Sequence, residues 1–508
     1  MNSSISSFLM KNQSNFMAIS LIAILIIVVF SSNEPRGSDQ FWYVADAISV
    51  SNGVFTTNNV FPNSMQADSD ALRPFVQNRP IVYLAGALVY FGLNAVLAYK
   101  IINLSCLILI GLFLDKLLVH AKASSLSRQF ALALVVGTPA IIFSLFNPLT
   151  QIFDALLIIS IFYFLLIGID LQKSNIKQFL FICIAAIVSI IAVMQRQDFL
   201  LFIAAFPLIL LFSNSANVSR GGDLRGRIGL AAVYITIFLT CKLLLKLPTH
   251  LGSPLPAWSA FTVGSQADWG NMVVFFADLG YLNSLDYPRL IKSKSLDFLY
   301  NLIKLDILLT PLNLFLVCFF IVAFFEFKYR RYSGVLIVAT LMVLTLFLVF
   351  LSFQYQYRYA IFLLPIIIYI LLTSKTYFYL GKRFQNLTIV TIYALMFSSV
   401  IFSYAVASRI SSEGKEVAAF LESLPNALSV NGNILVIYEG GSSLSVAYRY
   451  PDSKVFYVTP STLDRDFWND VTMVLDRNSR LNNTDRDLFD GLQKFGQAGN
   501  GWQVWVKP

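Results

Sequence analysis

Residues 152–169 read IFDALLIISIFYFLLIGI, an apolar run in which Asp154 is the one charged side chain. As a helix, a run of this length covers about the thickness of a bilayer core. Similar runs recur along the chain near 16–30, 94–118, 129–146, 178–194, 199–212, 228–247, 305–325, 334–353, 359–373 and 387–408. The sequence therefore predicts a polytopic α-helical membrane protein with about eleven transmembrane helices.

The composition points the same way. Of 508 residues, 57% are hydrophobic and 13% charged, and the mean hydropathy is +0.68. Soluble domains carry about 25% charged residues, so a soluble protein is excluded. The shorter run 81–92 begins after Arg79-Pro80 and is predicted to be a re-entrant or interfacial segment. The first run is predicted to be a retained anchor, with a cleaved signal peptide as the alternative.

The charges predict the side of the membrane on which each loop lies. Residues 1–408 carry 27 Lys and Arg and 16 Asp and Glu, and 27 minus 16 is +11. With a cytoplasmic N-terminus, this excess falls on the cytoplasmic loops, as the positive-inside rule requires. Those loops then hold four acids, Asp115, Asp170, Asp223 and Glu326, and fifteen bases, Lys11, Lys116, Lys122, Arg128, Lys173, Lys177, Arg220, Arg225, Arg227, Lys328, Arg330, Arg331, Lys375, Lys382 and Arg383.

Three long segments then lie outside the cytoplasm, at 31–80, 248–304 and 409–508. We expect a transmembrane catalytic domain over 1–408 and a separate domain over 409–508. In the tail, short β-rich runs near 434–438, 455–458, 471–475 and 502–506 alternate with expected helices near 412–423 and 485–495. This alternation predicts a small α/β domain. The role expected for it is to support the transmembrane part or to dock an acceptor substrate.

The residue inventory excludes several kinds of chemistry. There are two histidines, and the four cysteines each lie inside an apolar run, so a metal site built on His and Cys is not available. A divalent metal such as Mg²⁺ or Mn²⁺ would need carboxylates. The chain has no glycine-rich phosphate loop, and no nucleic-acid partner is expected.

A first candidate carboxylate comes soon after the first span, in the stretch 37–48, GSDQFWYVADAI. At 100° per residue, Phe41 and Ile48 share an apolar face, which predicts a helix lying in the membrane surface. The opposite face carries three polar side chains that should point to water, those of Asp39, Tyr43 and Asp46. The alternative is that Ser38 or Asp39 caps this helix.

A second candidate carboxylate is Asp154, at the outer start of its span. An acid with apolar neighbours at that depth usually faces a cavity or a partner, although stabilisation by the positive end of the helix dipole is the alternative. Asp198 is similarly placed, but the nearby Arg196 suggests an interfacial ion pair.

Candidate cations lie near the same outer face. They are Arg79, Lys100 and Arg358, the last in the aromatic stretch 355–359, YQYRY. Lys100 lies inside an apolar run and needs an anionic partner unless it snorkels. The functional alternative is a clamp for a lipid phosphate.

These pieces, in this order, resemble the GT-C superfamily of integral-membrane glycosyltransferases, above all the branch of protein O-mannosyltransferases and lipid A aminoarabinose transferases. The resemblance covers 15–410. It rests on Asp39, on RPIVYL at 79–84 and FGLN at 91–94, on Lys100, on FDALL at 153–157, and on Arg358-Tyr359 with Pro365 downstream. Three departures are Gln40 where a second acid is usual, a single Pro80 where the family has two prolines, and Lys100 where Arg is common.

The resemblance implies a GT-C fold with interfacial helices in the first outer loop. It also implies transfer of one sugar from a polyprenyl-phosphate carrier to a glycan, lipid or protein acceptor, outside the inner membrane of a bacterium. Asp39 is the candidate general base, and Asp154 is a second catalytic candidate. Tyr43 and Asp46 are candidates for binding the sugar or acceptor, and the donor phosphate would bind Arg79, Lys100 and Arg358. Direct displacement would invert the anomeric centre.

Two other functions also fit some of these features. A flippase or transporter for a lipid-linked glycan would carry intramembrane charges and broken spans as well, but it should show internal repeats and no dedicated acid in the first loop. An O-antigen-type polymerase or ligase would share the spans, the outer loop and the lipid-phosphate donor.

The charge distribution generates a first prediction, that the tail lies outside the cytoplasm. A reporter that is active only in the cytoplasm, fused after Pro508, should be silent, whereas a reporter that is active only outside should work at the same point. Activity of the cytoplasmic reporter would overturn the assigned topology.

Overall fold

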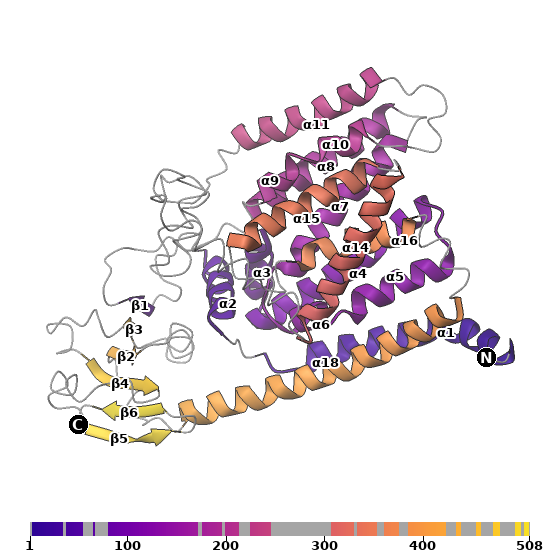
Figure 1. The fold of residues 1–508 in the computed structure, drawn as a ribbon. Helices are drawn as coiled ribbons and strands as arrows, with labels where there is room; N and C mark the ends of the chain where they lie inside the picture. Colours follow the sequence, from indigo (N-terminus) through magenta and orange to yellow (C-terminus); the bar gives the residue numbers. More distant parts are fainter. Residues whose placement is uncertain are drawn as a thin grey trace, which may run out of the picture. The chain divides into compact units, whose positions relative to one another are not determined.

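Figure 1 shows the computed structural model of the chain. It describes residues 3–33, 37–53, 64–66, 80–170, 175–195, 199–212, 224–244, 306–329, 333–352, 360–374, 385–422, 433–437, 454–458, 471–477, 493–498 and 502–506. The chain divides into two compact units. The first is Met1–Ile27 with Ile102–Leu145 and Thr150–Tyr404, and the second is Val28–Ile101 with Phe146–Leu149 and Ala405–Pro508.

Most of the described residues are helical. The helices are α1 (Ser3–Phe30), α2 (Gly37–Ser51), α3 (Pro80–Tyr90), α4 (Ala95–His120), α5 (Ser125–Gly137), α6 (Pro139–Phe146), α7 (Gln151–Asp170), α8 (Asn175–Gln195), α9 (Phe199–Ile203), α10 (Pro207–Leu211), α11 (Leu224–Leu244), α14 (Leu309–Lys328), α15 (Gly334–Ser352), the 3₁₀ helix η3 (Ile361–Leu363), α16 (Leu364–Thr373) and α18 (Gln385–Glu422). The strands are β1 (Ser64–Gln66), β2 (Asn433–Ile437), β3 (Lys454–Val458), β4 (Val471–Arg477), β5 (Gln493–Ala498) and β6 (Trp502–Val506).

Six of the described helices are long and apolar enough to cross a membrane, namely α1, α4, α7, α8, α14 and α18. A seventh candidate is the pair α5 and α6, which is bent by 54°. The protein is thus an integral membrane protein, and each of the eleven predicted spans overlaps at least one described helix. The number eleven stays a prediction, because the apolar helices in α11, α15 and α16 are shorter. α3 has 11 residues and spans about 16 Å, so it is too short to cross.

The prediction of one helix over 199–212 is wrong, because α9 and α10 are separate. Pro207 has no N–H, and its ring would clash with the carbonyl of Ile203 four residues earlier, so a helix cannot continue through it. The backbone crosses the gap with 3₁₀-type bonds, from Phe206 N to Ile203 O at 3.1 Å and from Ile209 N to Phe206 O at 2.9 Å. The break between α5 and α6 has the same cause, because Pro139 has no N–H with which α5 could continue.

α7 is the most enclosed of the six long spans. In its most apolar window 78% of the residues are buried, against 28% in α1 and 33% in α18. It packs on α8, α10, α16 and η3 within the first unit (Figure 1). α1 and α18 instead leave apolar side chains such as Ile19 and Phe397 exposed, which suits helices that contact lipid. Asp154 is thus carried by the helix that lies deepest among its neighbours.

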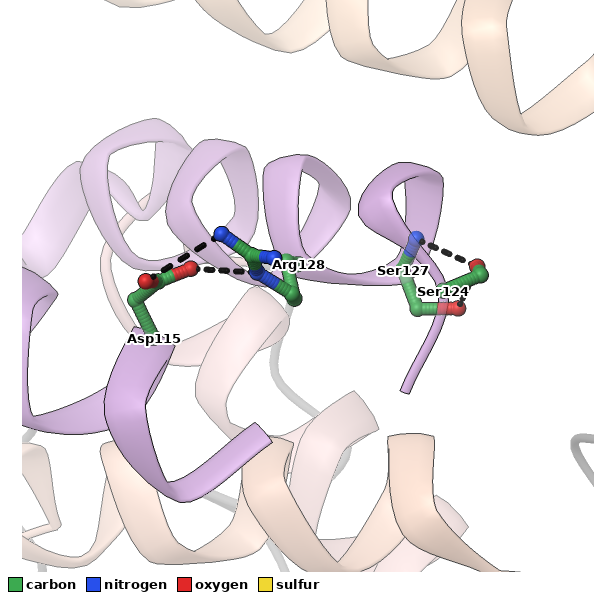
Figure 2. Close-up of polar contacts among 4 residues, drawn as sticks. All are labelled: Asp115, Ser124, Ser127 and Arg128. Carbon is green, nitrogen blue, oxygen red and sulfur yellow. Dashed lines mark hydrogen bonds and ion pairs between the residues drawn. The ribbon is translucent and has the colours of Figure 1, made fainter. Parts of the chain in front are cut away.

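Figure 2 shows the polar contacts that fix the turn between α4 and α5. Arg128 donates from Nε to Asp115 Oδ1 at 2.6 Å and from Nη2 to Asp115 Oδ2 at 3.3 Å. Ser124 caps α5 by accepting a hydrogen bond from Ser127 N at 3.1 Å. The ion pair therefore joins the last turns of α4 to the first turn of α5, at the end of α4 that the charge distribution places in the cytoplasm.

The strands of the tail belong to one sheet with the order β1-β3-β2-β4-β6-β5. β2, β3, β4 and β6 coincide with the four predicted strands. The helix expected at 485–495 is wrong at its end, because Gln493–Ala498 form β5 and pair antiparallel with β6. Its residues 485–492 lie outside the described ranges. The helix expected at 412–423 is the end of α18, a single 38-residue helix that continues from the last span.

One strand of this sheet comes from the segment between α2 and α3, and the sequence did not predict it. β1 pairs in parallel with β3, with Met65 opposite Phe456 (Figure 1). Hydrogen-bonded strands cannot lie on opposite sides of a bilayer, so the segment between α2 and α3 and the tail are on the same side. The chain must therefore cross the membrane an even number of times between them, as the predicted topology requires.

We predict that cysteines at positions 65 and 456 can be joined in the full-length protein by a short thiol-specific crosslinker. Neighbouring strands lie about 5 Å apart, well within the reach of such a reagent. The crosslink should appear as a mobility shift on a denaturing gel. A Met65→Cys, Gln497→Cys pair is the matched control and should not link, because β5 lies at the opposite edge of the sheet. Equal linking of both pairs would contradict the β1–β3 register.

Candidate functional site

The second unit holds most of the described candidate residues, on α2, α3 and the start of α4. α2 packs closely on α3, and Gly86 makes this approach possible. A Cβ atom at position 86 would lie 2.5 Å from Val50 Cγ1, which is closer than real Cβ atoms come, and 3.1 Å from the Ala47 carbonyl oxygen, which is a tight contact. Glycine at this position therefore sets the distance between the two helices.

An apolar cluster fixes the other side of α2. Val44 is fully buried against Ala95 and Val96 at the start of α4, with Ile48 and Val89 packed beside them. This burial removes apolar side chains of α2 from water and is favourable in proportion to the area buried. α2 is thereby held between α3 and α4 instead of lying free on the membrane surface.

A polar contact adds to this packing and involves the candidate Tyr43. The hydroxyl of Tyr99, a fully buried residue of α4, donates to the carbonyl oxygen of Tyr43 at 3.0 Å. The two rings meet edge to face with centroids 6.1 Å apart. Tyr99 immediately precedes Lys100, so Tyr43 contacts the turn of α4 that carries Lys100.

Lys100 is completely buried. Its ammonium donates to four oxygens of the segment that follows α1, namely Ser31 Oγ at 2.7 Å, Ser32 O at 2.9 Å, Asn33 Oδ1 at 3.0 Å and Ser31 O at 3.2 Å. Burial of a charge is costly unless hydrogen bonds compensate it. Of the two alternatives for Lys100, snorkelling to an open interface is contradicted, because the segment after α1 supplies these oxygens inside the protein.

The residue that departs from the family pattern, Gln40, has a described partner. Its Nε2 donates to Asn147 Oδ1 at 2.7 Å, and Asn147 is buried in the connection between α6 and α7. This contact ties the first turn of α2 to residues 146–149 within the second unit. Gln40 thus positions the start of the helix that carries Asp39.

Asp46 is buried, with 3% of its surface exposed. The expectation that it points to water is wrong, because α3 covers this side of α2. Burial, and after it the negative charge of Asp46, raise the pKa of Tyr83 above its usual value. The negative charge of Asp46 therefore acts on Tyr83 of α3.

The other candidates of this part of the chain are less fully described. Asp39 lies in the first turn of α2, and its side chain is outside the described structure. Arg79 and Arg358 lie outside the described residues, and so do Arg196 and Asp198. Their roles stay predictions.

Asp154 belongs to the first unit, where it is fully buried near the start of α7. The hydroxyl of Thr150 donates to Asp154 Oδ2 at 3.4 Å, and the Asp154 backbone N–H donates to Thr150 O at 2.9 Å. In the same unit, the buried Asn103 of α4 donates from Nδ2 to the Ser144 carbonyl oxygen at 3.2 Å. The two contacts with Thr150 place the buried Asp154 carboxylate near the positive end of α7, where the helix dipole stabilises negative charge.

Sequence reasoning missed the partners of the candidates. Ser31, Ser32 and Asn33 read as a linker after the first span, and Asn147 reads as a turn residue before Pro148. One signal was available for residues 31–33, since three small polar residues end an apolar span at the depth where a buried lysine needs acceptors. Within the described parts of the chain, no group of three or more His, Cys, Asp or Glu side chains could hold a metal ion.

No family model matches the chain, and no curated protein matches it in sequence. Among solved structures, the chain is similar to ArnT from Cupriavidus metallidurans bound to undecaprenyl phosphate. The TM-score is 0.59 and the identity 10%, over 97% of this chain and 98% of that one. The apo state of the same ArnT gives a TM-score of 0.54, also at 10% identity, over 97% of both chains.

The chain is also similar to the archaeal oligosaccharyltransferase AglB from Archaeoglobus fulgidus, in complex with an inhibitory peptide and a dolichol-phosphate. Here the TM-score is 0.51 and the identity 13%, over 98% of this chain and 74% of that one. ArnT and AglB are GT-C membrane glycosyltransferases. At such low identity the similarity establishes the fold alone, and the predicted GT-C resemblance is confirmed at that level: the chain has the GT-C fold.

Proposed function

We propose that the protein is a glycosyltransferase that moves one sugar from a polyprenyl-phosphate carrier to an acceptor on the outer side of the membrane. The observation that carries the proposal is the fully buried Lys100 ammonium, held by residues 31–33, which lie just before the helix that bears Asp39. The first residues of the connection between α1 and α2 thus hold a buried cation, and the helix that follows the connection carries a carboxylate. These are the groups that transfer from a phosphate needs.

Lys100 is proposed to bind the donor phosphate. A phosphate leaving group gains most from a cation that is already oriented in surroundings of low dielectric constant. In the described structure the ammonium points to neutral oxygens of Ser31, Ser32 and Asn33, which a phosphate oxygen can replace as acceptors. Arg79 and Arg358 are proposed as further ligands. The solved ArnT and AglB structures contain undecaprenyl phosphate and dolichol-phosphate, which supports a lipid phosphate as the ligand.

Asp39 is proposed as the general base. An acceptor oxygen attacks the anomeric carbon, the bond from that carbon to the phosphate oxygen breaks, and polyprenyl phosphate leaves with the electron pair. Asp39 accepts the proton of the acceptor hydroxyl. This displacement inverts the anomeric centre. Asp154 is a second catalytic candidate, and Tyr43 and Asp46 are proposed to contact the sugar or acceptor.

The location and the tail complete the proposal. The N-terminus is proposed to lie in the cytoplasm of a bacterium and the tail outside its inner membrane, because of the distribution of basic residues. The tail, 409–508, is proposed to be a separate α/β domain that supports the transmembrane part or docks the acceptor. Pairing of β1 with β3 supports a mechanical role, because it anchors the first outer loop to the tail.

The proposed reaction is tested with purified protein and a panel of short-chain polyprenyl-phosphate sugars, by measuring release of the lipid phosphate in the presence of acceptors. Release would separate a transferase from a flippase, which moves its substrate without breaking this bond. If no donor of the panel loses its phosphate with any acceptor, the proposed function is wrong.

For Lys100→Gln we expect donor affinity at least about tenfold weaker than in the parent, because a hydrogen bond to a charged group contributes about 1.5–3 kcal/mol. Binding can be measured by isothermal calorimetry with a short-chain polyprenyl phosphate. Arg128→Gln is the matched control, since Arg128 is also a hydrogen-bonded cation but pairs with Asp115, about four turns further along α4. It should bind donor like the parent.

Thermal unfolding of the same Lys100 variant separates binding from folding. Loss of the four contacts to residues 31–33 should lower the unfolding temperature, and Lys100→Arg, which keeps the charge, should recover part of the affinity. An unfolding temperature that falls while donor affinity stays unchanged would show that Lys100 is structural only.

For Asp39→Asn we expect a stable protein whose turnover falls about 10²-fold or more, because general base catalysis contributes about 10²–10⁴-fold. The amide keeps the size of the side chain and can still cap α2, so the unfolding temperature and donor affinity should stay at the parent values. Transfer rates near those of the parent would remove Asp39 from the proposal and leave Asp154 or Asp46 as the base.

A further inference from the structure

Lys100 is covered by the three residues that follow α1. Its ammonium is completely buried, whereas Ser31, Ser32 and Asn33, whose oxygens it contacts, are each partly exposed. Because Lys100 has no exposed surface, a phosphate can reach the ammonium only if part of its cover moves. Residues 31–33 are a part of that cover that already touches solvent, and we call them the strap.

The contacts between the strap and Lys100 are numerous, but each of them is replaceable. An ammonium has three N–H groups, and the strap offers four oxygens to them, at 2.7–3.2 Å from Nζ. At least one N–H is therefore shared between two acceptors. All four oxygens are neutral, whereas a phosphate oxygen adds charge attraction to the hydrogen bond. A phosphate therefore competes effectively with the strap for the ammonium.

The helices at the two ends of the strap have contacts of their own. Ser31 Oγ donates to Val28 O at 2.7 Å, which ties the start of the strap to the last turn of α1. α2 is held by its packing on α3 and α4 and by the contact of Gln40 with Asn147. Release of the strap from Lys100 therefore leaves both helices anchored. The side chains of the strap are polar and would be hydrated after release.

We infer that the strap closes the phosphate site of Lys100 in the free protein and is displaced by the phosphate of the donor. This inference rests on the proposed function and adds a form of regulation to the same site. When only a fraction of the free protein is competent to bind, the apparent dissociation constant is the intrinsic constant divided by that fraction. A closed strap therefore lowers donor affinity, and a looser strap should raise it.

Asn33→Ala tests the sign of this effect. The substitution removes one of the four oxygens and leaves three for the three N–H groups, so the variant should fold. We expect short-chain polyprenyl phosphate to bind about three- to tenfold more tightly than to the parent, because a contact that holds the strap closed is lost. Isothermal calorimetry measures this affinity. If the strap instead orients the ammonium for the phosphate, the same variant should bind more weakly.

Ser124→Ala is the matched control for loss of stability. Ser124 caps α5 by accepting a hydrogen bond from Ser127 N, beyond the end of α4 that is opposite to Lys100. This variant should unfold at a lower temperature and bind polyprenyl phosphate like the parent. Tighter binding by Ser124→Ala as well would trace the effect to general loosening of the protein, and the inference would be wrong.

Movement of the strap can also be measured directly, with Ser32→Cys in the full chain. The rate at which a water-soluble maleimide labels position 32, followed by mass spectrometry of peptides, should rise when polyprenyl phosphate is added. Ser51→Cys is the control, because Ser51 ends α2 and is also partly exposed. Its labelling rate should stay the same. An unchanged or lower rate at position 32 would show that the ligand leaves the strap in place.

The outcomes separate this inference from the proposed function. If Lys100→Gln weakens binding while Asn33→Ala binds like the parent or more weakly, Lys100 binds the phosphate but the strap does not compete with it, and the inference alone is wrong. If Lys100→Gln binds polyprenyl phosphate as well as the parent does, the proposed role of Lys100 fails and the inference fails with it. If Asn33→Ala does not fold, the labelling at position 32 decides.

Discussion

The burial of one ammonium group organises the part of the protein where α1, α2 and α4 meet. A lysine inside a transmembrane helix is costly unless every N–H finds an acceptor, and Lys100 meets this requirement with oxygens of Ser31, Ser32 and Asn33. The chain after α1 is therefore held against the start of α4. Because α2 follows within a few residues, the same interaction limits where its first turn, and hence Asp39, can lie.

The rest of the second unit refines this placement by close packing. Gly86 lets α3 approach α2, the cluster of Val44, Ala95 and Val96 holds α2 on α4, and Gln40 ties its first turn to Asn147. None of these contacts takes part in the proposed reaction itself. Together they hold a helix with a carboxylate rigidly, which matters because a general base must stay within hydrogen-bond reach of the proton that it takes.

The sheet couples two parts of the chain that are far apart in sequence. β1 pairs with β3 of the tail, so the loop between α2 and α3 is joined to the tail by backbone hydrogen bonds. A loop of this length would lose much conformational entropy if it were ordered alone. Pairing with an existing sheet supplies a template, and it gives the tail a structural reason to be part of the same polypeptide as the transmembrane helices.

The sequence by itself determined the membrane class, the helical segments, four of the tail strands and the candidate residues Asp39, Lys100 and Asp154. These follow from hydropathy and from the cost of charge in an apolar run, which are local properties. Only the tertiary structure decided that Asp46 is buried, that Lys100 is enclosed by residues 31–33, that β1 joins the tail sheet and that Pro207 divides a predicted span into α9 and α10. The first three depend on which distant segments meet, and periodicity along one segment carries no information about its neighbours. The fourth was readable in principle, since a proline inside an apolar run leaves the carbonyl four residues earlier without its helical donor.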